Sequence, residues 1–101
     1  MTPLTKRQRR WLKPQVHHLR PVVIVGQNGV TEAVLKEIEL ALDHHELIKV
    51  KVNAGERQLR DEMVAQIQQR TDSDLVDRIG NIAALFRANP EKKHRFALPE
   101  G

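Results

Sequence analysis

The chain has 101 residues, 40% of them apolar and 30% charged, which is the composition of one folded domain and excludes a disordered chain. It contains no cysteine, so a disulfide framework and a thiolate zinc site are excluded. No apolar run approaches the roughly 20 residues that span a bilayer, and no apolar segment of signal-peptide length follows the basic N-terminus. We therefore expect a soluble, cytoplasmic protein without membrane contact, with residues 1–101 as a single domain.

The net charge of +4 is distributed unevenly along the chain. Residues 1–31 hold 6 basic and no acidic residues, residues 32–81 hold 7 basic and 11 acidic, and residues 82–101 hold 4 basic and 2 acidic. A basic front beside an acidic middle favours a polyanionic partner, most often nucleic acid. The plainer alternative is a solvated helix that is rich in arginine.

The first predicted element is a helix that follows the cap residue Thr5 and runs toward Leu19. Its apolar positions share one side, which should face the core: Leu12, Val16 and Leu19. Basic side chains at spacings of four, three and four residues form a basic stripe on the opposite side: Lys6, Arg10, Lys13 and His17. Arg7 lies beside this basic stripe. Pro14 should kink the helix because it removes a backbone donor.

Four strands and two further helices are predicted after this helix. The strands are short β-branched or alternating runs at residues 22–25, 47–52, 75–79 and 82–87. One helix follows the cap residue Thr31 and the other covers residues 56–70. Gly80-Asn81 suits a tight hairpin turn between the last two strands. The order α-β-α-β-α-β-β predicts an α/β domain with a mixed four-stranded sheet, a core at about residues 4–88, and an extended tail at residues 89–101.

Two glycines enclose the junction between the first strand and the second helix, in the sequence Gly26-Gln27-Asn28-Gly29. Glycines let a phosphate approach the backbone, and the free N–H groups at a helix start attract anions. The polar pair Gln27 and Asn28 adds hydrogen-bonding groups without a repelling charge. This spelling agrees with a loop that clamps a nucleic-acid backbone, although a simple turn would look the same. It lacks the further residues of a P-loop or a dinucleotide-binding turn.

Four stretches together resemble the CRM domain, the chloroplast RNA splicing and ribosome maturation module: LTKRQRRWLK, HHLRPVVIVGQNGVTEAVLKEIELAL, HHELIKVKV and IGNIAALFR. The stand-alone bacterial, YhbY-type form is the most similar, over residues 4–99. The resemblance implies a compact fold similar to the C-terminal domain of bacterial translation initiation factor three. It also implies binding to structured RNA and association with the precursor of the large ribosomal subunit.

The family's glycine-bounded loop matches residues 26–29, and its basic first helix matches by charge and position at Lys6, Arg7, Arg10 and Lys13. Two residues depart from the pattern. Pro14 stands where a residue that continues the helix is expected, and Phe86 replaces a tyrosine, which removes one polar contact.

Three further sets of residues each allow two interpretations. Lys49 and Lys51 extend the basic surface if their face of the sheet is open, and are otherwise ordinary surface lysines. Trp11 lies between the apolar and basic sides of its helix, where core-edge packing is favoured over base stacking. The adjacent histidine pairs, residues 17–18 and 44–45, do not have the spacing of metal ligands.

We therefore predict a non-enzymatic RNA-binding protein without a cofactor, a metal or a small-molecule substrate. The expected partner is large-subunit ribosomal RNA or its precursor, and the expected contacts are the loop at residues 26–29, the basic stripe with Arg7, and the two strand lysines. A module that docks on ribosomal proteins, with secondary RNA contact, is one alternative. A small phosphotransfer or nucleotide-binding enzyme is another, but the Lys-Ser/Thr of a P-loop is missing. No nucleophile is spaced with a base and an orienting group.

Overall fold

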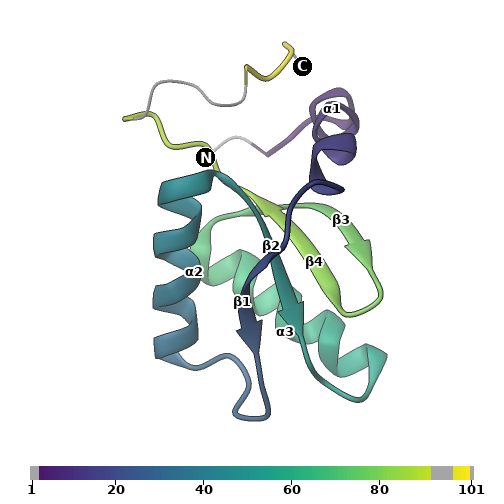
Figure 1. Ribbon diagram of the computed structural model, residues 1–101, viewed down its shortest axis with the longest axis vertical. Coiled ribbons are helices and arrows are strands. Elements are labelled where there is room, and N and C mark those ends of the chain that lie inside the picture. Colours follow the sequence, from purple (N-terminus) through teal and green to yellow (C-terminus); the bar gives the residue numbers. More distant parts are fainter. Residues whose placement is uncertain (1–2, 92–96, 101) are drawn as a thin grey trace.

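The computed structural model describes residues 3–91 and 97–100 of the chain. Within these residues the elements are α1 (Lys6–Val16), β1 (Pro21–Val25), α2 (Glu32–His45), β2 (Leu47–Val52), α3 (Arg57–Thr71), β3 (Asp74–Ile79) and β4 (Ile82–Phe86) (Figure 1). The predicted order α-β-α-β-α-β-β is confirmed, and so is the mixed four-stranded sheet.

The strands lie in the order β1-β2-β4-β3. β1 pairs with β2 in parallel, while β4 is antiparallel to both β2 and β3. The first strand-helix-strand unit therefore pairs directly, but β4 separates the two strands of the second unit. Burial explains this order, because four of the five residues of β4 are buried, whereas β3 carries three charged residues and lies at the edge. Charged residues protect an edge strand from pairing with other chains.

The two faces of the sheet have separate cores. On one face, α2 and α3 cover the alternating residues of β2, of which Val50 is fully buried beside Ile38 and Ile67. On the other face, α1 packs Leu12 and Val16 against one end of the sheet, together with the neighbouring side chains Leu47, Val76, Ala84 and Phe86. The helix α1 covers only that end, so the rest of this face is open (Figure 1).

Local signals set the helix starts as predicted. The Thr5 hydroxyl accepts from the Gln8 N–H at 3.1 Å, while the Gln8 side chain accepts from the Thr5 N–H, which forms a complete capping box. The Thr31 hydroxyl likewise accepts from the Val34 N–H at 3.1 Å. The helix α1 continues through Pro14 but ends at Val16, three residues before the expected Leu19.

The helical period predicts that Leu59, Met63, Val64 and Ile67 face the core from α3, and the structure differs at one of these positions. Val64 and Ile67 are buried and Met63 is half-buried, but Leu59 is 42% exposed. Leu59 lies in the first turn of α3, where Arg60 takes the half-buried position and donates from Nη1 to the Ala54 carbonyl at 3.0 Å.

Arg87, directly after β4, joins α2 and α3. Its Nη1 donates to Glu39 Oε2 and to the Thr71 carbonyl, each at 2.7 Å, and its Nη2 donates to Asp43 Oδ1 at 2.7 Å. The Arg87 side chain is 15% exposed, so these are partly buried, charge-assisted bonds.

The segment expected to form an extended tail lies partly outside the described residues, at positions 92–96 and 101. Where the chain is described again, Leu98 packs against the core beside α1, and Gln8 Nε2 donates to the Pro99 carbonyl at 3.0 Å. No helix among residues 3–91 and 97–100 is long and apolar enough to cross a membrane.

Candidate nucleic-acid interface

The glycine-bounded loop is a tight turn between β1 and α2. The Gly29 N–H donates to the Gly26 carbonyl at 3.1 Å, and the Thr31 N–H donates to the Gly29 carbonyl at 3.1 Å. Gln27 and Asn28 at its tip are exposed. The turn therefore presents two polar side chains and a bare backbone at the point where α2 begins.

The backbone conformation requires glycine at only one of the two glycine positions of this loop. Gly29 has a φ of +73°, which L-residues rarely adopt, so the turn itself requires glycine there. Gly26 has a φ outside that region, and a Cβ built on it would meet no atom within 4 Å. Neither the backbone conformation nor internal packing requires a glycine at position 26. Its missing side chain instead leaves an exposed backbone that a partner can approach closely.

Two neighbouring segments complete the same edge of the sheet. The Asn53 N–H donates to the Val25 carbonyl at 2.9 Å, and Asn81 Nδ2 donates to Asn53 Oδ1 at 3.3 Å. These bonds tie the loop after β2 to the β3–β4 turn and to the end of β1, directly before the glycine-bounded loop. Gly55, in the first of these segments, also has open space where a Cβ would stand. The edge is therefore rich in accessible backbone.

The predicted basic stripe on α1 lies elsewhere. All four of its residues and Arg7 are exposed, as expected for the side opposite the buried Leu12 and Val16. However, α1 packs near the start of β3, since Arg9 Nε donates to the Leu75 carbonyl at 2.9 Å. Figure 1 shows α1 toward one end of the molecule, with the β1–α2 loop at the other end. The longest extent of the molecule is 38 Å, so the two predicted contact regions do not form one compact patch.

Lys49 and Lys51 lie on the open face between these two regions. Both are half-buried, and Lys49 Nζ donates to the Leu19 carbonyl at 3.0 Å, which ties this lysine to the segment between α1 and β1. Lys51 pairs with Ile24 on β1, whose side chain is 59% exposed. Their face is thus the open one, with Lys51 nearer to the glycine-bounded loop.

The single serine of the chain is buried in a turn. Ser73, the single serine of the chain, is 7% exposed, and its hydroxyl lies 2.8 Å from the Thr71 hydroxyl. It belongs to the turn after α3. In the part of the chain that the structure describes, no three histidine, aspartate or glutamate side chains gather closely enough to hold a metal ion.

One basic group was not singled out from the sequence. Arg57, Arg60 and Arg78 meet at the edge that carries the glycine-bounded loop. Arg57 and Arg60 are three residues apart at the start of a predicted helix, which was a usable signal. Arg78 is distant in sequence and reaches them only because β3 runs past the start of α3.

The mixed sheet, its two unequal helical faces and the glycine-bounded turn define a small α/β domain with a GxxG loop. The CRS1 / YhbY (CRM) domain model matches residues 4–87, and the chain belongs to this family. The resemblance noted from the sequence is thus confirmed at the family level.

Bacterial relatives of single-domain length are similar to nearly the whole chain. An RNA-binding protein of Haemophilus influenzae is 47% identical over 93 residues, which cover 92% of this chain and 94% of the relative. The probable RNA-binding protein YqeI of Bacillus subtilis is 36% identical, covering 95% and 99%. The solution structure of a hypothetical protein from Staphylococcus aureus matches with a TM-score of 0.82 at 32% identity, covering 95% of this chain and 99% of that one.

Proposed function

We propose that this chain is a non-enzymatic RNA-binding protein of the cytoplasm that assists assembly of the large ribosomal subunit. Membership of the CRM family and the names of the relatives support the RNA partner. The role in subunit assembly follows the family resemblance. The RNA would be large-subunit ribosomal RNA or its precursor, recognised by shape and charge, because the chain has only 3% aromatic residues for base stacking.

The open backbone at Gly26 is the observation that carries this proposal. Its glycine has no conformational or packing cause within the protein. A phosphodiester backbone needs close approach to N–H donors, and a missing Cβ permits that approach. The loop also lies directly before α2, and the positive N-terminal end of that helix attracts a phosphate.

The basic residues extend the contact away from the loop. A strand of RNA that leaves the loop over the open face meets Lys51 first and then reaches the basic stripe of α1. This route includes the loop, the strand lysines and the basic stripe, but as two separate contact regions that the sheet connects. Each contact region would neutralise different phosphates, so each should contribute separately to the salt dependence of RNA affinity.

The test compares a fragment of large-subunit ribosomal RNA with a DNA duplex of equal length in salt titrations. Gly26→Asp is the test variant, because it places a negative charge in open space at the proposed phosphate site. Gln69→Glu is the matched control, since it changes the net charge equally at an exposed position near the far end of α3. Circular dichroism verifies that each variant is folded.

We expect wild type to prefer the RNA and Gly26→Asp to lose most of that affinity, while Gln69→Glu binds nearly as wild type. Equal loss in the two variants would mean that general charge, and not the loop, governs binding. Absence of preference for RNA over DNA in wild type would refute the proposed function.

A ribosome-docking module with secondary RNA contact is favoured by one observation. The open sheet face carries the exposed apolar side chains Ile24, at 59%, and Ile79, at 49%. A protein partner would cover them. RNA binding that is weak and insensitive to salt, together with salt-resistant binding to ribosomal proteins, would establish this second function.

A further inference from the structure

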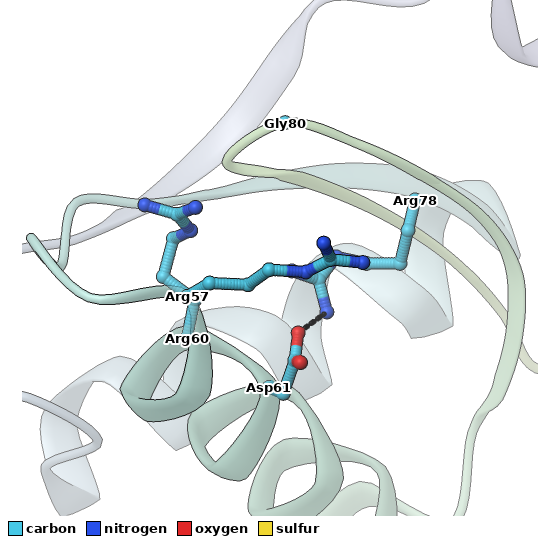
Figure 2. A pocket seen from close by; sticks show the side chains of 5 residues that line it. All are labelled: Arg57, Arg60, Asp61, Arg78 and Gly80. Carbon is cyan, nitrogen blue, oxygen red and sulfur yellow. Dashed lines mark ion pairs between the residues drawn. The ribbon is translucent and has the colours of Figure 1, made fainter.

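A pocket of about 400 Å³ lies between the start of α3 and the β3–β4 turn, lined by Arg57, Arg60, Asp61, Arg78 and Gly80 (Figure 2). The first three come from the start of α3, and the last two from the end of β3 and its turn. Three guanidinium groups and one carboxylate give the lining a formal charge of +2. We infer that this pocket binds a phosphate group of the RNA, at the same end of the sheet as the phosphate held at the glycine-bounded loop.

Internal contacts hold two of the arginines in place. Arg78 Nη1 forms an ion pair with Asp61 Oδ1 at 2.9 Å, and Arg60 Nη1 donates to the Ala54 carbonyl at 3.0 Å. Figure 2 shows their side chains extending toward each other from α3 and β3. Two like charges that converge repel one another, and the single carboxylate of Asp61 does not balance both. An added anion would relieve this repulsion.

Two of the arginines that line the pocket have an unused donor. The Nε atoms of Arg60 and Arg78 are buried and have no hydrogen-bond partner among the described residues. A buried donor without a partner is costly, and a phosphate oxygen would satisfy it with a charge-assisted bond. The remaining arginine, Arg57, is exposed at the first position of α3. Its guanidinium is therefore accessible to an incoming ligand.

The start of α3 adds to this anion preference. Its N-cap residue Glu56 makes no side-chain hydrogen bond to the helix, so the first N–H groups lack a side-chain partner. The opposite wall is the β3–β4 turn, where Gly80 has a φ of +57° and no atom lies within 4 Å of a Cβ built there. The wall at Gly80 thus leaves room for a backbone to pass.

The position of the pocket identifies the source of the phosphate. Gly29, at the end of the glycine-bounded loop, is the neighbour of Met63, since a Cβ on Gly29 would lie 3.6 Å from the Met63 Cε. Met63 is one turn along α3 from Arg60. The bond between Asn81 and Asn53 joins the loops on the other side. One nucleic-acid strand can therefore touch the loop and the pocket together, and this inference rests on the proposed RNA-binding function.

The test variant is Arg57→Gln, and the control is Lys36→Gln, which removes the same charge from an exposed position on α2. Arg57 is exposed, so its replacement should not disturb folding, and thermal unfolding verifies this. Binding to the large-subunit ribosomal RNA fragment is measured from 0.05 to 0.3 M salt. We expect Arg57→Gln to bind about tenfold more weakly, because one charge-assisted hydrogen bond to phosphate is lost. The slope of log affinity against log salt should become shallower by about 0.7–0.9.

Lys36→Gln should retain the wild-type slope. If Arg57→Gln and Lys36→Gln behave alike while wild type binds RNA, the pocket inference is overturned and the proposed function stands. If wild type does not bind RNA, the proposed function fails, and an NMR titration with inorganic phosphate decides about the pocket. Shifts centred on Arg57 and Gly80 would retain it as a phosphate site independent of RNA, and their absence would overturn it as well.

Discussion

Alanine substitutions at the two loop glycines should separate folding from binding. Gly29→Ala forces an L-residue to adopt a φ of +73°, while its new methyl group would make only an ordinary contact with Met63 at 3.6 Å. The backbone term therefore dominates, at about 1–2 kcal/mol of lost stability. Gly26→Ala meets no atom and needs no unusual φ. Its smaller unfolded-state entropy should leave stability unchanged or raised by up to about 1 kcal/mol.

The effects on RNA affinity should run in the opposite order. A methyl group on Gly26 stands on the exposed backbone and prevents a phosphate from reaching the loop N–H groups. The loss of one hydrogen bond to a charged group, about 1.5–3 kcal/mol, corresponds to roughly 10- to 150-fold weaker binding. Gly29→Ala should weaken binding less, because its Cβ points toward Met63 on α3 rather than into open space.

Both quantities are measured on the same samples. Thermal unfolding followed by circular dichroism should show Gly29→Ala melting about 4–16 °C below wild type, since each kcal/mol shifts Tm by roughly 4–8 °C in a domain of this size. Fluorescence anisotropy with a labelled ribosomal RNA fragment gives the affinity. Wild-type affinity in a folded Gly26→Ala protein would refute close approach at this glycine and leave the loop as a simple turn.

Two further predictions concern Arg87, which joins α2 and α3, and the separation of the glycine-bounded loop from the basic stripe. Arg87→Met should lower the free energy of unfolding by about 2–4 kcal/mol in urea titrations, because it breaks charge-assisted bonds and leaves a buried acceptor without its donor. Arg70→Met, which removes the exposed ion pair with Glu32 at 2.8 Å, should cost less than about 1 kcal/mol, and equal costs would show that the partial burial of Arg87 does not matter. Lys6→Ala combined with Arg10→Ala should reduce the salt slope of RNA binding by about two units or less. The change in binding free energy of this double variant should add to that of Gly26→Asp within about 0.5 kcal/mol. A larger coupling energy would contradict two separate contact regions.

The parts of the fold that depend on neighbouring residues could be read from the sequence. Thr5 and Thr31 each accept a hydrogen bond from the N–H three residues later, as their positions predicted. The Gly80-Asn81 turn followed equally from two residues, since Gly80 supplies the positive φ at the first central position of a tight hairpin. These signals act over one turn of chain, so no tertiary contact is needed to recognise them.

The order of the strands depends on competition for the centre of the sheet. Two strand-helix-strand units favour parallel pairing and the last two strands an antiparallel hairpin, which leaves the order of the strands open, and in the structure β4 lies between β2 and β3. The reason is legible in the sequences once they are compared: β3 is Asp-Leu-Val-Asp-Arg-Ile and β4 is Ile-Ala-Ala-Leu-Phe. A strand without charges gains more from a position with neighbours on both sides. The strand order therefore depends on the difference in charge between β3 and β4, which is not visible in either strand-helix-strand unit alone.

The separation of the loop from the basic stripe follows from the chain path. The helix α1 precedes β1 and the loop follows it, so the strand must carry the chain from one contact region to the other. Five residues at a rise of about 3.3 Å span roughly 16 Å, and the packing of α1 beyond the sheet end adds to this distance. Residues that are close in sequence therefore lie in two separate contact regions. Arg78 is remote from the loop in sequence, yet antiparallel pairing brings the end of β3 to the same edge as the end of β1. An RNA strand at the loop is thus closer to the arginine pocket than to α1. Removal of the Arg57 charge should therefore change RNA binding at the loop more than removal of the basic stripe does.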